Sequence, residues 1–491
     1  MGAEHGDRGL SGPHLARLLG AWRSARPAYV ALSAAIRLLV LDGRLPLRTR
    51  LPGERELASA LGVSRTTAAA AYAALREEGF LASRRGAGSW TTLPADRDRA
   101  PAAAPAISGA AHEVIDLSAA ATAAPEGALH RALAAATAEL PRHLPTAGYE
   151  AAGLPSLRAA VAAHLTGRGV PTAPTQVLVT AGAQHAFTLL LRVLCGPGDR
   201  VLVDHPTYPN ALDAVRAVGA RPVPVALLDD GWDVDMFAAT LRQAAPRLAY
   251  LIADHHHPTG LTLAAADRAA VVALARETRT PLVVDETMAE LGLDPDRPEP
   301  PPVAALDPGG ETVVTVGSMS KAFWAGLRIG WIRASPTLIG RLALARATVD
   351  MASPVVEQLV ARELLADPAA VLGPQRALLR ARRDALVAAV RATLAGWTFA
   401  VPAGGLSLWA RLDAPRSSAL AAVADGHGVR IAAGPRFGVD GAFERFVRLP
   451  YTLPEPQLEA AVERLALAWR AVAGDPSEGA AADPAGAALV A

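Results

Sequence analysis

Hydrophobic side chains follow two different spacings along this chain. In residues 14–43 and 53–81 they recur every three or four positions, which is the spacing of amphipathic helices. From residue 170 onward, short runs of β-branched residues alternate with Ala- and Leu-rich stretches, a pattern typical of an α/β domain with a largely parallel sheet. Residues 93–113 are rich in Ala and Pro and show no apolar periodicity, so we interpret them as a tether.

The N-terminal pattern predicts a helix-turn-helix. Pro27 interrupts the first helical stretch and divides it into two helices. In residues 53–81, a short helix runs to Leu61, Gly62 breaks it, and Ser64 can cap a longer helix. Two helices joined by so short a turn form the helix-turn-helix motif.

The start of the longer helix carries groups suited to DNA. In a helix-turn-helix this end enters the major groove, and here it presents Ser64, Arg65, Thr66 and Thr67. Two short extended runs around Arg84, Arg85 and Gly86 then predict a hairpin wing. Residues 27–92 contain nine Arg and five acidic residues, a net charge of +4, which favours a polyanionic partner. Two alternatives stay open: such helix pairs also occur in proteins that do not bind DNA, and the wing arginines could simply be solvated.

Length and composition narrow the class of protein. With 491 residues, 51% of them hydrophobic, the chain is long enough for more than one globular domain. Cys195 is the only cysteine, so no disulfide can form within the chain. The N-terminus lacks the pattern of a secretory signal, and no uninterrupted run of 18 apolar residues occurs, so we expect a cytoplasmic protein.

In the C-terminal part, each of five predicted strands leads to residues that can bind a ligand. The strands are residues 176–180, 200–204, 248–254, 281–286 and 312–318. They are followed in turn by a helix start at Gly182, Ala183 and Gln184, by Tyr208, by His255, His256 and His257, by Asp285, and by Lys321. Ligands of open α/β sheets bind at the carboxyl ends of the strands, so we expect these groups to meet in one crevice.

Lys321 is the only lysine in the chain, beside 47 arginines. Arginine never deprotonates in a protein, so a single retained lysine indicates an amine that must lose its proton and attack a carbonyl. Schiff-base chemistry of this kind favours pyridoxal phosphate as the cofactor. Free N–H groups at the helix start and the side chains of Ser318, Ser320 and Arg328 suit its phosphate. Asp285 would keep its pyridine nitrogen protonated, and Tyr208 would stack on its ring.

Each of these residues also has a simpler explanation. Lys321 could be a solvated charge, Tyr208 a core residue and Asp285 a helix cap. The three histidines could bind a metal, but adjacent residues point in different directions and no spaced partners are evident, so we expect none. One shared pyridoxal phosphate site explains the order and spacing of all of them together.

The stretch LPGERELASALGVSRTTAAAAYAALREEGFLASRRGAGS resembles the GntR-type winged-helix domain, and the resemblance covers about residues 28–92. It implies that the partner is double-stranded operator DNA. It also implies that the contacts come from Arg55, Ser64, Arg65, Thr66, Thr67, Arg85 and Gly86.

Residues 114–470 are similar to fold-type I aminotransferases of the aspartate aminotransferase class. The resemblance implies that Lys321 holds the cofactor, that Asp285 pairs with its pyridine nitrogen and that Tyr208 stacks on its ring. Its phosphate would be held by Ala183, Gln184, Ser318 and Arg328. Arg448, in RFVRLPYT, resembles the arginine that binds a substrate carboxylate. Tyr149, in GYEAAGLPSLR, resembles the tyrosine that reaches the partner subunit's phosphate, which implies a homodimer.

Two positions depart from that family's pattern. Its NPTG motif reads HPTG here, so His257 stands where an Asn usually donates to the phenolic oxygen of the ring. A tyrosine expected shortly after Asp285 is absent, and Thr287 is the nearest hydroxyl. Both groups tune the pKa of the Schiff base, so their loss bears on transamination more than on cofactor binding.

A GntR-type domain tethered to an aminotransferase-like domain resembles the MocR class of regulators, including the PdxR type. The resemblance implies a transcription regulator that senses pyridoxal phosphate, alone or with an amine or amino acid, through an aldimine at Lys321. It also implies a head-to-tail homodimer. The alternatives are a pyridoxal phosphate-dependent aminotransferase with an appended DNA-binding module, and a DNA-binding scaffold that has lost its cofactor.

The expected organisation therefore has five segments. They are an N-terminal helical extension (1–26), a mainly α winged helix (27–92), a linker (93–113), an α/β aminotransferase-like domain with a mostly parallel sheet (114–473) and a disordered tail (474–491).

Overall fold

The computed structural model describes residues 8–20, 22–23, 27–41, 44–45, 47, 49–84, 88–92 and 114–473. The predicted linker 93–113, the tail 474–491 and the wing residues Arg85 and Gly86 lie outside the described residues.

The N-terminal part forms the predicted helix-turn-helix with a hairpin wing. Its helices are α1 (Gly12–Leu19), α2 (Ala28–Leu41), α3 (Glu54–Leu61) and α4 (Arg65–Glu77). Its sheet has the order β1 (Arg8–Gly9), β2 (Thr49–Arg50), β4 (Gly88–Thr91) and β3 (Leu81–Arg84). Gly62 ends α3 in a left-handed conformation (φ 61°), which glycine adopts without strain.

One small core holds this part together. Leu15 of α1, Leu32 of α2 and Leu57 of α3 are fully buried in it, so the segment before Pro27 packs into the same unit. Ser64 caps α4 as predicted, because its Oγ accepts a hydrogen bond from the Thr67 N–H at 3.0 Å.

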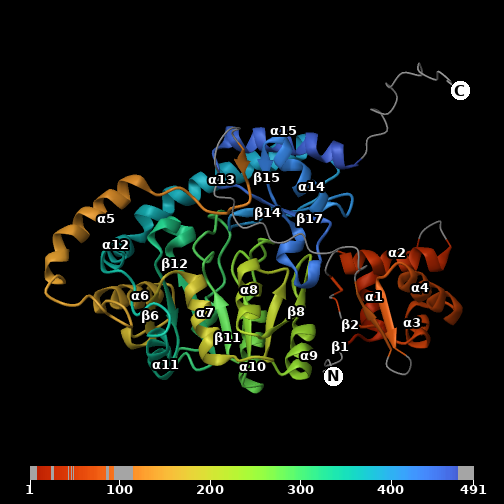
Figure 1. Ribbon diagram of the computed structural model, residues 1–491, viewed down its shortest axis with the longest axis horizontal. Helices are drawn as coiled ribbons and strands as arrows, with labels where there is room; N and C mark the ends of the chain where they lie inside the picture. The colour runs from red at the N-terminus through yellow and green to blue at the C-terminus, as the bar shows by residue number, and fades with distance from the viewer. Residues whose placement is uncertain are drawn as a thin grey trace, which may run out of the picture.

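The larger part is organised around an eight-stranded sheet that is mostly parallel, as predicted (Figure 1). Its order is β6 (Val177–Thr180), β13 (Gly330–Arg333), β12 (Val313–Ser318), β11 (Leu282–Asp285), β10 (Leu248–Leu251), β7 (Arg200–His205), β8 (Arg221–Leu228) and β9 (Gly231–Trp232). Only β13 and β9 run antiparallel to their neighbours. All five strands predicted from the sequence are therefore parallel to one another.

Side chains alternate between the two faces of this sheet, as the two-residue period of a strand requires. Leu178, Val283 and Val314 face one core, which is covered by α7 (Ala183–Leu194), α8 (Pro209–Ala217) and α11 (Pro336–Arg346). Val179 and Val284 face the other core. That core is covered by α5 (Glu126–Glu139), α6 (Pro155–Gly167), α9 (Val234–Ala244), α10 (Ala265–Glu277) and α12 (Val355–Ala366).

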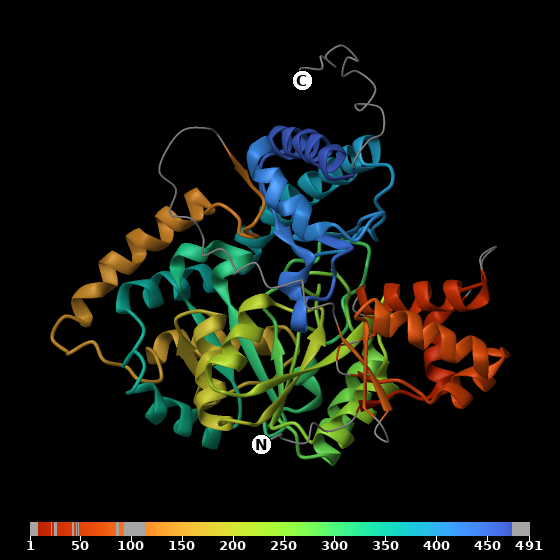
Figure 2. The same cartoon turned by 45° about the vertical axis from the view of Figure 1, so that its right-hand side comes forward.

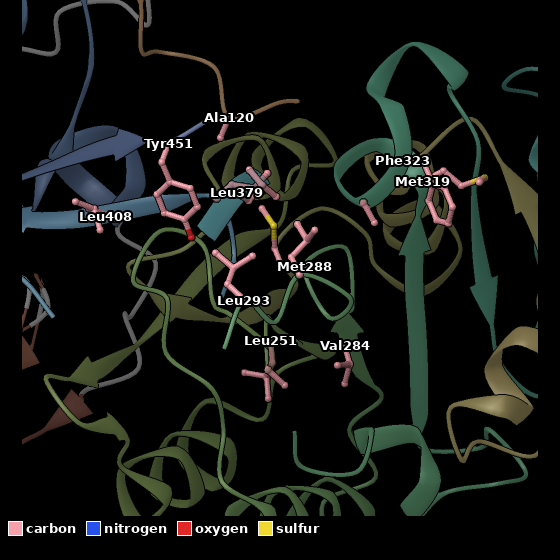
Figure 3. Packing of buried hydrophobic residues seen from close by; sticks show 14 of the residues in the cluster. Ala120, Leu251, Val284, Met288, Leu293, Met319, Phe323, Leu379, Leu408 and Tyr451 are labelled. Atoms are coloured by element: carbon pink, nitrogen blue, oxygen red, sulfur yellow. The ribbon is translucent and has the colours of Figure 1, made fainter. Parts of the chain in front are cut away.

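A smaller layer closes over the carboxyl ends of the strands (Figure 2). It contains α13 (Pro368–Thr393), α14 (Ser417–Ala424), α15 (Glu455–Ala473), a sheet ordered β14 (Ser407–Arg411), β17 (Phe446–Pro450) and β16 (Ala432–Ala433), and the pair β15 (Val429–Arg430) and β5 (Ile115–Asp116). Its Leu408 and Tyr451 share a core with Met288 and Leu293 of the large sheet's loops (Figure 3).

The winged helix lies beside α9 of the same chain (Figures 1 and 2). The Phe443 N–H donates to the Leu41 carbonyl at 2.8 Å, and Met236 packs against both cores. The helices within the described ranges include none long and apolar enough to cross a membrane.

Candidate functional site

The strand order explains why the predicted ligand-binding residues meet. β6, β7, β10, β11 and β12 are parallel, so their carboxyl ends lie along one edge of the sheet. Loops and helix starts at that edge carry the groups predicted from the sequence. The small sheet adds Arg448, which lies on β17.

The predicted phosphate cradle is built by a close approach of backbone segments. Gly182 precedes α7 with φ 87°, and a Cβ there would lie 2.8 Å from a terminal nitrogen of Arg328. A Cβ on Gly330 would lie 2.8 Å from the Gly182 Cα, so both positions require glycine. The Arg328 guanidinium donates to the Ala181 carbonyl at 2.9 Å and reaches the Ser320 Oγ at 3.4 Å. These two contacts hold the Arg328 guanidinium next to the turn at Gly182.

Backbone N–H groups complete this cradle. Ala183 and Gln184 lie in the first turn of α7, where helical N–H groups lack an intrahelical acceptor and attract anions. The Gln184 side chain points elsewhere and donates to the Asn210 carbonyl at 3.2 Å. Ser318 Oγ donates to Ser320 Oγ at 3.0 Å, so both hydroxyls lie together at the end of β12.

Lys321 lies in a π-helical turn (Ser320–Trp324) directly after β12. Its Nζ donates to the Ala120 carbonyl at 2.7 Å. Burial and the positive charge of Arg448 together lower the pKa of Lys321 to about 8, although Asp285 opposes the shift. A lysine with such a pKa is partly neutral near pH 7, so its amine can act as a nucleophile.

Asp285 is buried at the end of β11 and is 6% exposed. One carboxylate oxygen accepts the Thr287 N–H at 2.9 Å, and the other accepts the Tyr250 hydroxyl at 2.6 Å. Burial holds the pKa of Asp285 above its ordinary value, although these two hydrogen bonds and Lys321 oppose the shift. Thr287 thus orients Asp285. Tyr250 was not singled out by the sequence, because inside the apolar run of β10 it looks like one more core residue.

Tyr208 and His257 lie opposite each other, with ring centroids 6.2 Å apart. The Asn210 amide donates to the Tyr208 hydroxyl at 2.8 Å and fixes that ring. Burial holds the pKa of His257 well below its ordinary value, and Arg448 and Lys321 add to the shift. His257 is therefore neutral at physiological pH and can donate one hydrogen bond.

Arg448 is 3% exposed, yet no acidic side chain in the described part of the chain lies within 4.0 Å of its guanidinium. One terminal nitrogen donates to the Ser118 carbonyl, and its Nε has no partner among the described residues. Its guanidinium lies 5.7 Å from the ring centroid of Phe437. Burial and the charge of Arg436 together lower the pKa of Arg448 to about 10, although Asp116 opposes the shift. A buried cation with an unused donor is a site for a carboxylate.

The remaining predicted residues, Tyr149, His255 and His256, have other surroundings in the described part of the chain. Tyr149 is 69% exposed, in the loop before α6. The histidines next to His257 have other neighbours, since His255 Nε2 lies 3.2 Å from Glu299 and His256 Nε2 lies 3.6 Å from Asp204. Within the described ranges, no group of three or more potential ligands is arranged to hold a metal ion.

Four of the predicted DNA-binding residues are exposed, one on α3 and three at the start of α4, and Thr67 beside them is half-buried. The Arg65 side chain is 61% exposed, and its Nε lies 3.6 Å from a carboxylate oxygen of Glu54. Arg55, Ser64 and Thr66 are exposed as well. An exposed arginine beside exposed hydroxyls at a helix N-terminus can reach phosphates and base edges.

Family comparisons divide the chain at the same place. Residues 28–90 match the bacterial regulatory proteins of the gntR family, and residues 112–465 match the aminotransferases of class I and II. The chain is 30% identical over 428 residues to the "Probable rhizopine catabolism regulatory protein MocR" of Rhizobium meliloti, covering 82% of this chain and 85% of that protein. It is 28% identical over 426 residues to the HTH-type transcriptional regulator YisV of Bacillus subtilis, covering 80% and 86%.

A solved structure matches the larger part. It is that of LysN, the α-aminoadipate aminotransferase of Thermus thermophilus, complexed with N-(5'-phosphopyridoxyl)-L-leucine. The TM-score is 0.68 at 26% identity, and the match covers 74% of this chain and 93% of that one.

Proposed function

We propose a cofactor site and an effector for this chain, which belongs to the MocR-like GntR regulators. These proteins join a GntR domain to a class I and II aminotransferase domain. The chain is a DNA-binding transcriptional regulator. We propose that its larger part holds pyridoxal phosphate at Lys321 and senses an amino compound there. Arg448 carries the proposal, because it is a buried cation beside the only lysine of the chain, and no carboxylate of the described residues pairs with it.

The residues at the sheet edge fit this cofactor. The turn at Gly182, the first N–H groups of α7 and Arg328 would hold its phosphate, since guanidinium and free N–H groups suit a dianion. Asp285 would pair with the pyridine nitrogen. When bound, pyridoxal phosphate supplies an aldehyde that captures primary amines and a ring that withdraws electrons from the captured carbon. Lys321 would hold that aldehyde.

His257 and Tyr208 would border the ring of the cofactor. A neutral imidazole at His257 can donate one hydrogen bond to the phenolic oxygen, in place of the Asn amide of the aminotransferases. At the other position, the Thr287 N–H donates a hydrogen bond to Asp285. These two departures support sensing as the role of the site rather than sustained turnover.

An aminotransferase with an appended DNA-binding module is the second candidate. Lys321 and Asp285, which transamination needs, are both present, and their pKa values are shifted by burial. Steady product formation from common amino donors and 2-oxo acids at ordinary enzyme rates would favour that candidate.

We also propose that the protein is a homodimer arranged head-to-tail. The exposed Tyr149, at 69%, supports this arrangement, because a large side chain in that position can reach a second subunit. In light scattering after size-exclusion chromatography the protein should have twice the chain mass of 50.6 kDa. A monomer at micromolar concentration would contradict the dimer.

A spectral titration tests the proposed function. Purified protein with pyridoxal phosphate should show a visible absorbance band that Lys321→Ala abolishes. Amines and amino acids that change this band should also change the affinity for operator DNA selected from a random pool, because an effector shifts an equilibrium only by its differential affinity. A colourless protein after incubation with pyridoxal phosphate would refute the cofactor assignment.

A further inference from the structure

The first segment of the larger part lies across the candidate site. We call residues 115–122 the strap. Ile115 and Asp116 form β5, which pairs in parallel with β15, and the Leu117 N–H donates to the Arg430 carbonyl at 2.8 Å. Leu117 is fully buried. The strap is therefore fixed to the small layer at its start.

Two carbonyl groups of the strap accept hydrogen bonds from Arg448 and Lys321, two of the cationic residues of the site. Ser118 accepts a hydrogen bond from the Arg448 guanidinium, and Ala120 accepts one from the Lys321 Nζ at 2.7 Å. The chain bends at Ser118, and this single short segment serves both side chains. The backbone of the strap thus takes the donors that a ligand needs.

Arg448 binds a carboxylate more strongly than it binds the Ser118 carbonyl. A carboxylate accepts two parallel, charge-assisted hydrogen bonds from a guanidinium, whereas the Ser118 carbonyl accepts one and carries no net charge. The Nε of Arg448, which has no partner among the described residues, offers the second donor for that fork. The fork would use Nε together with the terminal nitrogen that now donates to Ser118, so a carboxylate competes with Ser118 for that nitrogen. Asp116, whose charge acts on Arg448, lies in the strap itself, so a bound carboxylate would repel the strap.

We propose that the strap competes with the effector's carboxylate for Arg448. Displacement of the strap from Arg448 then carries the signal toward the DNA-binding unit. This inference rests on the proposed function and narrows it: the effector is an amino compound with a free carboxylate, and a simple amine leaves Ser118 on Arg448. In the sequence the strap follows the linker 93–113, which connects it to the winged helix.

Hydrogen exchange measured by mass spectrometry on the full-length, pyridoxal phosphate-loaded protein tests the strap directly. In the Arg448→Gln variant, without any effector, the amides of residues 115–122 should exchange about tenfold faster or more, because a hydrogen bond from a charged donor is lost. The matched variant Arg448→Lys keeps a cationic donor and should stay closer to the wild type. Equal strap exchange in wild type and Arg448→Gln would overturn the proposal.

A second arm needs no variant. Wild-type protein is exposed to sodium acetate, and separately to sodium chloride at the same ionic strength. Acetate, a carboxylate without an amine, should speed exchange in the strap, while peptides from β14 (Ser407–Arg411) stay unchanged in both salts. If acetate and chloride give the same strap exchange, the proposal fails, and this arm decides alone should Arg448→Gln be misfolded.

The strap proposal and the proposed sensing function can be tested separately. Ethylamine is L-alanine without its carboxylate, so the two compounds share the amine and the methyl group. If L-alanine speeds strap exchange and leaves DNA affinity unchanged, the strap stands and the proposed sensing function fails. If DNA affinity responds while strap exchange does not, sensing stands and the strap proposal fails.

Discussion

The lowered pKa of Lys321 leads to a quantitative prediction for its reactivity. With a pKa of about 8, roughly one tenth of the amine is neutral at pH 7 and about half at pH 8, whereas an ordinary lysine with a pKa of about 10.4 is neutral to well under 1% at pH 7. Only the neutral amine attacks a carbonyl. The rate at which the apoprotein captures pyridoxal phosphate should therefore rise about tenfold from pH 6 to 7, bend near pH 8 and level off above pH 9.

The chain makes the assay unambiguous, because Lys321 is its only lysine. Reduction with borohydride after short incubations, followed by peptide mapping, separates Lys321 from the N-terminal α-amine, which serves as an internal reference with its own pKa of about 7.7–8.0. Arg448→Gln removes a cation that lowers the pKa and should move the bend to higher pH. A rate that still climbs tenfold per pH unit between pH 8 and 10 would refute the reasoning.

Three further predictions concern single side chains. Tyr250→Phe removes the 2.6 Å hydrogen bond to Asp285 and leaves the packing unchanged, so the carboxylate loses about 1.5–3 kcal/mol of stabilisation. Cofactor affinity measured by absorbance should therefore fall. An unchanged affinity would mean that the contact does not orient Asp285. Arg65→Ala should abolish the mobility shift of operator DNA while the cofactor spectrum stays intact; a retained shift would count against α4 as the recognition helix. Ser64→Ala removes the cap on the Thr67 N–H and should destabilise the winged helix by about 1 kcal/mol in thermal unfolding, a loss that Ser64→Asp should avoid.

The sequence predicted the parts of the site that depend on residue type at strand ends. The five predicted strands formed as parallel neighbours or near neighbours, because β-branched runs between turn residues favour buried strands. Gly62 and Ser64 marked the helix-turn-helix by their backbone and capping preferences. In these cases the local preference and the tertiary structure agree, so the local sequence was sufficient to predict the elements.

Other parts of the site could not be predicted in this way. The carbonyls of Ser118 and Ala120 belong to the backbone, which every residue type shares, so no sequence signal marks them. Tyr250 lies within an apolar strand, and only the neighbouring strand brings Asp285 to its hydroxyl. The antiparallel strand β13 places Gly330 against Gly182, a contact between segments almost 150 positions apart. Long-range backbone contacts of this kind depend on topology.

The central claim is that a ligand at Lys321 and Arg448 controls the winged helix. The most direct test is the operator affinity of the pyridoxal phosphate-loaded protein, measured by fluorescence anisotropy at one fixed salt concentration with and without the amino acid that changes its absorbance most. The account predicts a change in Kd of about fivefold or more for the wild type, and none for Lys321→Ala. The same Kd with and without that amino acid in the wild type would contradict it.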